Sequence, residues 1–244
     1  MTGGKAFGAA DWPAVDFVVF DVDGTLYDQR PLRLRMARDL IFHTLGRADL
    51  RVARVLRAYR DIREEMGAEE TERFQAVLNE RVVRRTGSSV TEVTTTVSEW
   101  MDTRPLRYLA SCRFPRIDAL FGGLKRCGKR IGIFSDYPAR SKLAALGLEA
   151  DFVVSAEDEG VDILKPNPRG LDRLIERAQV SPERTLMIGD RCERDGASAM
   201  RAGARCLIRS TRPRQGWQTF RATRIRFFCR CWHRAKAHRQ DCAG

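Results

Sequence analysis

Histidine is scarce in this chain of 244 residues, which has only His43, His233 and His238. None of the three follows a segment with the pattern of a buried strand, so a serine–histidine or cysteine–histidine catalytic pair is hard to build. Long apolar runs are also missing, since no stretch approaches the ~18 residues that cross a membrane. The first residues, MTGGKAFGAADWP, lack the charged head and apolar core of a secretory signal. We therefore expect a cytoplasmic protein in which carboxylates carry out any proton transfer.

The seven cysteines are odd in number and irregular in spacing. In a chain of ordinary size with no secretory signal, this pattern favours reduced thiols over a disulfide framework.

Positive charge is concentrated at the C-terminal end of the chain. Of the net charge of +12, residues 209–244 contribute +9, because they hold ten basic residues and a single acid, Asp241. Such a tail is compatible with binding to nucleic acid or to an anionic membrane. Its cysteines are spaced C-x-C, which does not match the common zinc pattern. We favour the simpler interpretation that residues 211–244 form a basic, disordered extension.

The hydrophobic pattern changes twice along the chain. Residues 15–20 have the short, β-branched and aromatic pattern of a buried strand. The long stretch that follows has helical periodicity and many Arg and Glu residues, and it predicts about four helices. Strands then alternate with helices, which is typical of a parallel sheet covered on both faces. We therefore predict a core made of residues 1–28 and 111–210, with an inserted helical subdomain at 29–110.

Polar residues follow the predicted strands at their carboxyl ends, which is the edge where open parallel sheets bind ligands. They come from four separate places in the chain: Asp21 and Asp23 after FVVF, Ser135 at the end of KRIGIFS, Lys165 in the loop after the third strand, and Asp190 after TLMIG with Asp195 nearby. Carboxylates, a hydroxyl group and one lysine are thus predicted to share one crevice.

Four short motifs occur in a fixed order: DVDGT, a serine at a strand end, KP, and GDRCERD. Together they resemble the motifs of the haloacid dehalogenase superfamily, in particular its phosphoglycolate-phosphatase-like members, over about residues 15–210. The resemblance implies an α/β fold, a doubly wound, Rossmann-like parallel sheet of order 3-2-1-4-5, with an α-helical cap inserted after the first motif. The helical insertion that the hydrophobic pattern predicts lies at this position.

The resemblance also implies the chemistry of the site. Asp21 matches the nucleophile that attacks phosphorus, and Asp23 matches the general acid that protonates the leaving oxygen and later activates water. Two adjacent carboxylates resist ionising together, which favours a charged nucleophile and a protonated acid. The cofactor implied is Mg²⁺, held by Asp21, the backbone carbonyl of Asp23, and Asp190.

The other matched residues support this set. Ser135 and Lys165 match the groups that hold phosphate oxygens, and Thr25 belongs with them as a residue that orients the acids. Gly24 permits the tight turn after the strand. Asp195 fits the second acid of the last motif, which orients a metal-bound water.

Three functions remain open at this point. The first is a Mg²⁺-dependent phosphatase that hydrolyses a small soluble phosphate monoester through an aspartyl-phosphate. Asp23 argues against the dehalogenase branch of the superfamily, which lacks that residue. A phosphomutase of the same fold shares these motifs, and a nucleic-acid-binding protein would use the tail instead. The substrate is not fixed by the sequence, and either a monomer or a dimer is compatible with it.

We expect Asp28 to begin the linker to the cap, and Asp136 to cap the helix that follows it.

Overall fold

The computed structural model of the chain describes residues 9–221. Its centre is a sheet of parallel strands in the order β3-β2-β1-β4-β5-β6. The strands are β1 (Phe17–Phe20), β2 (Arg130–Ser135), β3 (Phe152–Ser155), β4 (Thr185–Gly189), β5 (Arg205–Arg209) and β6 (Thr219–Phe220). The predicted α/β class and the order 3-2-1-4-5 are confirmed, and one further strand is added at the edge.

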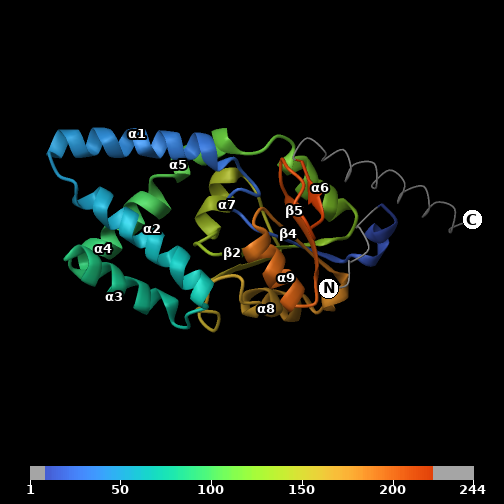
Figure 1. Cartoon of the computed structure of the whole chain (residues 1–244). Helices are drawn as coiled ribbons and strands as arrows, with labels where there is room; N and C mark the ends of the chain where they lie inside the picture. Colours follow the sequence, from blue (N-terminus) through green and yellow to red (C-terminus); the bar gives the residue numbers. More distant parts are fainter. Residues whose placement is uncertain (1–8, 222–244) are drawn as a thin grey trace, which may run out of the picture.

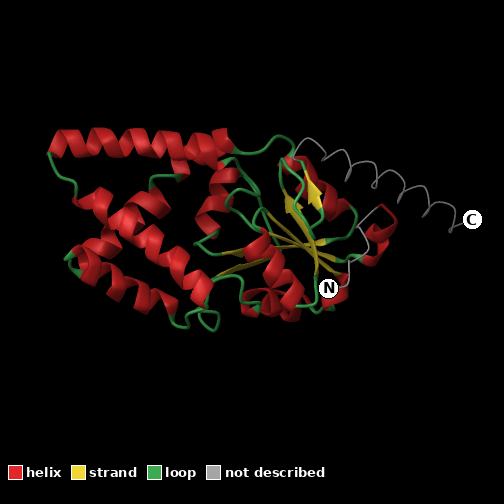
Figure 2. Ribbon diagram, viewed as in Figure 1, coloured by secondary structure: helices red, strands yellow, loops and turns green. Residues whose placement is uncertain are grey.

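Strand β1 lies in the middle of the sheet and is buried along its whole length. Its alternate residues face opposite layers, because successive side chains of a strand point to opposite faces. Val18 and Phe20 pack in one hydrophobic cluster with helices α6 (Ile117–Arg126) and α7 (Arg140–Leu146). The other two residues of β1 pack in a second cluster with α8 (Arg169–Ala178) and α9 (Ala197–Arg201). Helices therefore cover both faces of the sheet, as the alternating pattern predicts (Figure 2).

The segment between β1 and α6 forms a helical cap at one end of the sheet (Figure 1). Its helices are α1 (Gln29–Arg47), α2 (Arg51–Glu69), α3 (Phe74–Thr86), α4 (Val90–Val97) and α5 (Leu106–Cys112), with a π-helical turn, η2 (Ser98–Thr103), after α4. Helix α4 begins at a capping box in which Ser89 and Glu92 satisfy each other's backbone amides. No helix in the described part of the chain has the length and apolarity needed to span a membrane.

The two chain segments that link the core to the cap run antiparallel and are joined by backbone hydrogen bonds. The amide of Asp28 donates to the carbonyl of Cys112 at 2.9 Å, and the amide of Phe114 donates to the carbonyl of Leu26 at 3.1 Å. Asp28 itself is the N-cap of α1, where its Oδ1 accepts from the amide of Arg30 at 2.9 Å. This arrangement agrees with the prediction that Asp28 begins the linker.

The sheet continues beyond residue 210, where the sequence predicted a disordered extension. β6 pairs with β5 through the amide of Ile208, which donates to the carbonyl of Gln218 at 2.9 Å. Before β6, the indole of Trp217 lies against Gly196, so that a Cβ at residue 196 would be 2.3 Å from the ring. The start of this segment therefore belongs to the sheet, because it satisfies the open edge of β5. Residues 222–244 lie outside the described part, and the proposals for that tail stay predictions.

Candidate active site

Three carboxylates gather at the carboxyl end of the sheet. Asp21 follows β1, Asp190 follows β4, and Asp195 lies in the short π-helical turn η4 (Cys192–Gly196). One carboxylate oxygen from each lies within 4.8 Å of the other two. Asp195 is only 1% exposed, and its Oδ2 accepts from the backbone amides of Asp190 and Arg191 at 3.1 and 3.0 Å. The strand ends thus bring together acids that lie far apart in the sequence.

Within residues 9–221, Lys165 is the one lysine that contacts this cluster. Its Nζ donates to Asp21 at 2.7 Å and to Asp195 at 2.6 Å, and its side chain is 2% exposed. Burial alone would lower the pKa of this lysine, but the charges of Asp195 and Asp21 outweigh it and raise the pKa well above its ordinary value. Lys165 is therefore a fixed positive charge in the floor of the site.

One ammonium does not balance three carboxylates, of which Asp21 and Asp195 are buried and Asp190 is partly buried. Burial raises the pKa of Asp21 well above its usual range, and the neighbouring Asp195 and Asp190 add to the rise while Lys165 opposes it. Burial and the charge of Asp195 raise the pKa of Asp190 to about 7. Thr25 orients the cluster, since its Oγ1 donates to Asp21 Oδ2 at 3.1 Å. A cluster with excess negative charge and oxygen ligands is suited to a hard divalent cation.

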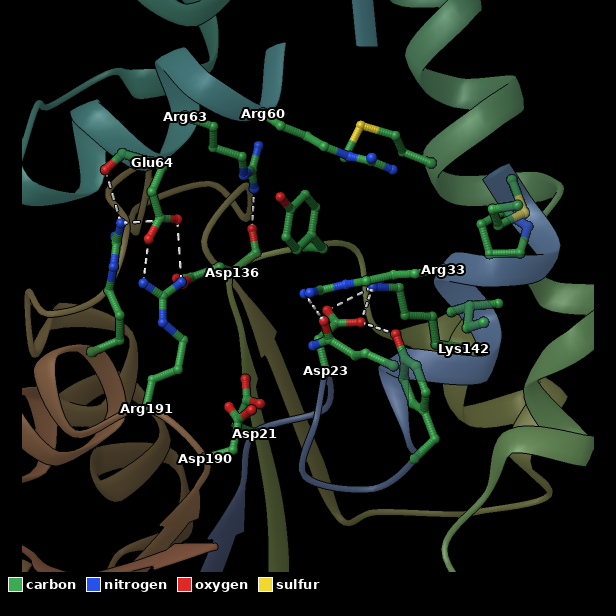
Figure 3. A pocket seen from close by; sticks show the side chains of 18 of the residues that line it. Asp21, Asp23, Arg33, Arg60, Arg63, Glu64, Asp136, Lys142, Asp190 and Arg191 are labelled. Carbon is green, nitrogen blue, oxygen red and sulfur yellow. Dashed lines mark hydrogen bonds and ion pairs between the residues drawn. The ribbon is translucent and has the colours of Figure 1, made fainter. Parts of the chain in front are cut away.

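Asp23 has different neighbours, although it follows Asp21 by two residues. Lys142 of α7 donates to both of its oxygens, at 2.8 and 2.7 Å, and the hydroxyl of Tyr27 donates to Oδ1. Burial would raise the pKa of Asp23, but the charge and hydrogen bonds of Lys142, with the hydrogen bond of Tyr27, lower it overall. In Figure 3, Asp23 and Lys142 line the pocket at a place separate from Asp21 and Asp190.

The pKa directions of the two aspartates are the reverse of those expected from the sequence. The expectation was a charged Asp21 beside a protonated Asp23. In the structure Asp21 has the raised pKa, because burial and the neighbouring acids disfavour its charged form. Asp23 has the lowered pKa, because a lysine and a tyrosine stabilise its charged form and outweigh its burial. A bound cation would reverse the balance at Asp21, since a metal is the largest local charge in such a site.

Sequence reasoning missed Lys142 and Tyr27. Lys142 lies in the first half of a short helix and is only 6% exposed, with Leu143 buried next to it. A lysine in a helix is most often solvated, and nothing local marks this one as the partner of an acid that lies 119 positions earlier. Tyr27 lies four residues after Asp23, so its proximity to the motif was the one usable signal.

The end of β2 contributes a fully buried hydroxyl and a linking carboxylate. Ser135 Oγ accepts from the amide of Tyr137 at 3.2 Å. Asp136 was expected to cap the next helix, but α7 has Ala139 at its N-cap. Asp136 Oδ1 instead accepts from the backbone amide of Lys165 at 2.9 Å. Asp136 therefore joins two of the motif loops, the one after β2 and the one that carries Lys165.

Gly24 is required by both its backbone and its surroundings. Its φ is +92°, a conformation that favours glycine, and a Cβ there would be 2.1 Å from Asp190 Oδ2. The carbonyl of Gly24 accepts from Arg209 Nη1 at 2.9 Å, and the Arg209 guanidinium lies 3.5 Å from the centre of the Phe114 ring. The DVDGT turn is therefore held from the far side by the last residue of β5.

The acids open into a cavity of about 730 Å³ between the core and the cap. Buried arginines connect the two sides. Arg63 of α2 lies 4.1 Å from the centre of the Tyr137 ring, and it donates to the carbonyl of Asp136 and to Glu157 at 3.2 Å. Arg194 of η4 donates to the carbonyls of Lys165 and of the cap residue Glu64. The cap is thus bound directly to the motif loops.

The comparisons with known proteins agree with this geometry. The family of haloacid dehalogenase-like hydrolases matches residues 15–203. The chain belongs to this family. It is therefore an enzyme of a hydrolase family, as the motifs predict.

Two proteins with similar sequences are named phosphatases. Glyceraldehyde 3-phosphate phosphatase of Methanopyrus kandleri is 30% identical over 196 residues, which cover 76% of this chain and 80% of that protein. The enzyme of the same name from Methanothermobacter thermautotrophicus is 27% identical over 199 residues, with coverage of 78% and 84%.

Solved structures share the fold at lower identity. 2-Haloacid dehalogenase of Pseudomonas syringae pv. Tomato has a TM-score of 0.60 at 21% identity, covering 88% of this chain and 99% of that one. The HAD-hydrolase YfnB of Bacillus subtilis, bound to magnesium, has a TM-score of 0.61 at 18% identity, covering 88% and 98%. At these identities the likeness concerns the fold alone.

Proposed function

We propose that this hydrolase is a Mg²⁺-dependent phosphatase of a small soluble phosphate monoester, and that it works through an aspartyl-phosphate on Asp21. The observation that carries the proposal is the cluster of Asp21, Asp190 and Asp195 within 4.8 Å of one another, beside the buried Lys165. A phosphate group can be held there by cations and attacked by a carboxylate from the same cluster.

The residues of the cluster fit Mg²⁺. Asp21 and Asp190 offer carboxylate oxygens, and burial together with neighbouring acids raises the pKa of both. The backbone carbonyl of Asp23 lies two residues after Asp21 in the chain. When bound, the ion would offset the charge of the carboxylates and of the phosphate. The carboxylate oxygens of Asp195 accept hydrogen bonds from Lys165 and from a backbone amide of the same loop, so we assign Asp195 a supporting role.

In the first step, an oxygen of Asp21 forms a bond to phosphorus and the bond from phosphorus to the ester oxygen breaks. Asp23 donates a proton to the departing oxygen. The incoming phosphate favours this protonated form, because like charge beside Asp23 raises the pKa of its carboxyl. Lys142 and Tyr27 fix the orientation of Asp23 through their hydrogen bonds.

In the second step, water attacks the phosphorus of the aspartyl-phosphate. Asp23 accepts the proton of that water, and the bond between phosphorus and Asp21 breaks to release phosphate and free the carboxylate. Lys165, Ser135 and Thr25 hold the phosphate oxygens in this proposal. The cap covers the site and excludes bulk water, which favours a small substrate.

The first natural substrate to assay is glyceraldehyde 3-phosphate, because two relatives are named for its hydrolysis. A cytoplasmic location stays a prediction from the sequence, and the choice between a monomer and a dimer stays open.

The test is the hydrolysis of an aryl phosphate by the purified protein with Mg²⁺, with EDTA, and with the variant Asp21→Asn. We expect phosphate release that requires both the metal and Asp21. A matched control is Asp28→Asn, which removes one carboxylate outside the cluster while leaving a good N-cap residue for α1. Activity that survives in Asp21→Asn would refute the covalent mechanism. An isomer formed from a sugar phosphate without release of phosphate would indicate a mutase instead.

A further inference from the structure

The cations that line the cavity are not all balanced by acids. Five of them have a carboxylate within 4 Å: Lys165 with Asp21 and Asp195, Lys142 with Asp23, Arg63 with Glu157, Arg191 with Glu64 and Glu193, and Arg194 with Glu64. These pairs hold the site together. Their charges are largely offset within the protein.

Arg33 and Arg60 are different. Both line the same cavity, Arg33 from α1 and Arg60 from α2. Within residues 9–221, no hydrogen bond or ion pair joins the guanidinium of Arg60 to another residue, and Arg33 donates only to the neutral amide oxygen of Gln29. Figure 3 shows Arg60 on the cap side of the pocket and Arg33 beside Asp23 and Lys142.

Much of the wall near these arginines is apolar. Leu32 and Met36 of α1, Leu56 of α2 and Trp100 of η2 all line the cavity. Arg33 and Arg60 are both exposed residues. The apolar wall reduces the screening of their charges by water on the cavity side, where an anion would bind. Helix α2 contributes two acids to the lining, Glu64 and Asp61. Asp61 lies 3.8 Å from Arg57 of the same helix and is paired with that arginine.

We propose that Arg33 and Arg60 form a second anion-binding subsite, and that the preferred substrates are phosphate monoesters with another negative group at the opposite end, a carboxylate or a second phosphate. This inference rests on the proposed phosphatase function, since the first phosphate lies at the acid cluster. The cavity volume of about 730 Å³ falls within the range of roughly 300–1,000 Å³ that is typical of small-molecule pockets. Guanidinium groups are suited to this role because their planar donors match carboxylate and phosphate oxygens.

The experiment uses three substrates with the same carbon skeleton and different groups at the far end. 3-Phosphoglycerate ends in a carboxylate, glycerol 3-phosphate in an alcohol and glyceraldehyde 3-phosphate in an aldehyde. We expect kcat/KM for 3-phosphoglycerate to exceed that for glycerol 3-phosphate by about tenfold or more. In Arg60→Gln or Arg33→Gln this ratio should fall, and in the double variant it should approach one.

The matched control is Arg54→Gln. Arg54 is exposed on the same helix as Arg60, it does not line the cavity, and its loss changes the net charge equally. The ratio should be the same in Arg54→Gln as in the unaltered protein. An equal kcat/KM for all three substrates would overturn the inference, as would a preference that both arginine variants retain.

Calorimetry separates this inference from the proposed function. In the variant Asp21→Asn with Mg²⁺ present, 3-phosphoglycerate should bind about tenfold more tightly than glycerol 3-phosphate, and the added change Arg60→Gln should remove the difference. If no ester is hydrolysed by the unaltered protein but this difference in binding is found, the phosphatase proposal is wrong and the subsite stands. If the two ligands bind equally, the subsite is wrong whatever the activity.

Discussion

Asp21 and Asp23 lie two residues apart at the end of one strand, and their surroundings give them opposite properties. Asp21 shares its space with two other carboxylates and one lysine, and its pKa is raised. Asp23 is held by a lysine and a tyrosine, and its pKa is lowered. Residue type and position in the motif are nearly the same in the two cases. The difference shows that neighbours from distant parts of the chain decide which carboxyl is protonated.

The largest expected effect comes from removing each carboxylate in turn. Asp21→Asn should lower kcat by ~10³-fold or more, and Asp23→Asn by ~10²–10³-fold, because the first removes the nucleophile and the second the proton donor. Thermal unfolding in EDTA at pH 7 should separate them. Asp21→Asn should be at least as stable as the unaltered protein, since it replaces an acid that burial disfavours in charged form. Asp23→Asn should lose ~1 kcal/mol or more, because Lys142 is left without its counter-charge. Changes in stability of the same sign would contradict the contrast.

The next effect concerns the lysine that distinguishes the two acids. Lys142→Met should lower kcat by ~10–10²-fold, because Asp23 loses two hydrogen bonds that orient it. Removing that positive charge should also raise the pKa of Asp23, so the part of the pH–rate profile that depends on this carboxyl should move to higher pH. Lys142→Arg should restore part of the activity.

The control for Lys142 is Lys125→Met, which removes an exposed lysine paired with an exposed Glu149. Its profile between pH 4 and pH 9 should overlay that of the unaltered protein. A profile that does not move in Lys142→Met would show that the lysine acts on folding alone.

The acid cluster should also make stability depend on pH. The pKa of Asp190 is about 7 in the folded protein and about 3.9 in an unfolded chain. Between these values the folded state holds a proton that the unfolded state lacks, so the free energy of unfolding should fall as pH rises, by up to about 1.4 kcal/mol per pH unit. Asp21 acts in the same direction.

Unfolding in EDTA at pH 5, 6 and 7 measures this slope. Asp190→Asn should flatten it, and Mg²⁺ should remove most of it at pH 7 because the bound ion stabilises the charged carboxylates. A protein that gains stability from pH 5 to pH 7 in EDTA would refute the assignment.

The last effect concerns Gly24, the residue that follows Asp23 in the motif. Gly24→Ala should cost ~1–3 kcal/mol, because a Cβ would meet Asp190 and the backbone has positive φ. Gly46→Ala is the matched control. Gly46 lies within α1 with nothing within 4 Å of an added Cβ, so this change should be neutral or stabilising by up to ~1 kcal/mol. Chemical denaturation of the two variants gives the comparison directly.

The sequence was informative where chemistry follows a buried strand. The residues Asp21, Ser135 and Asp190 each end an apolar run, so their shared location could be predicted from the parallel topology alone. The same reasoning predicted the helical insertion, because helical and strand periodicity differ. The sheet order came from the resemblance, and the structure confirms it.

The rest depended on pairs that no local pattern reveals. Lys142 meets Asp23 across 119 positions, and Arg63 meets Asp136 across 73. Arg63 lies on a helix with many other charged residues, and Lys142 lies on a short helix beside Arg140, so the sequence gives no reason to choose either cation. The protonation states of Asp21 and Asp23 could not be predicted for the same reason, because they depend on neighbours such as Lys142 and Asp195 that come from other parts of the chain.

The packing of Trp217 against Gly196 bears on where the functional unit ends. Gly196 follows Asp195 directly, and Trp217 lies after the last motif and before β6. A gene product that stopped at residue 210 would keep every motif and the whole cap, and would still lose the indole that backs the acid loop. Completeness of the motifs is therefore no measure of completeness of the enzyme, and a shortened or frame-shifted gene could encode a protein with an intact signature and a loosened site.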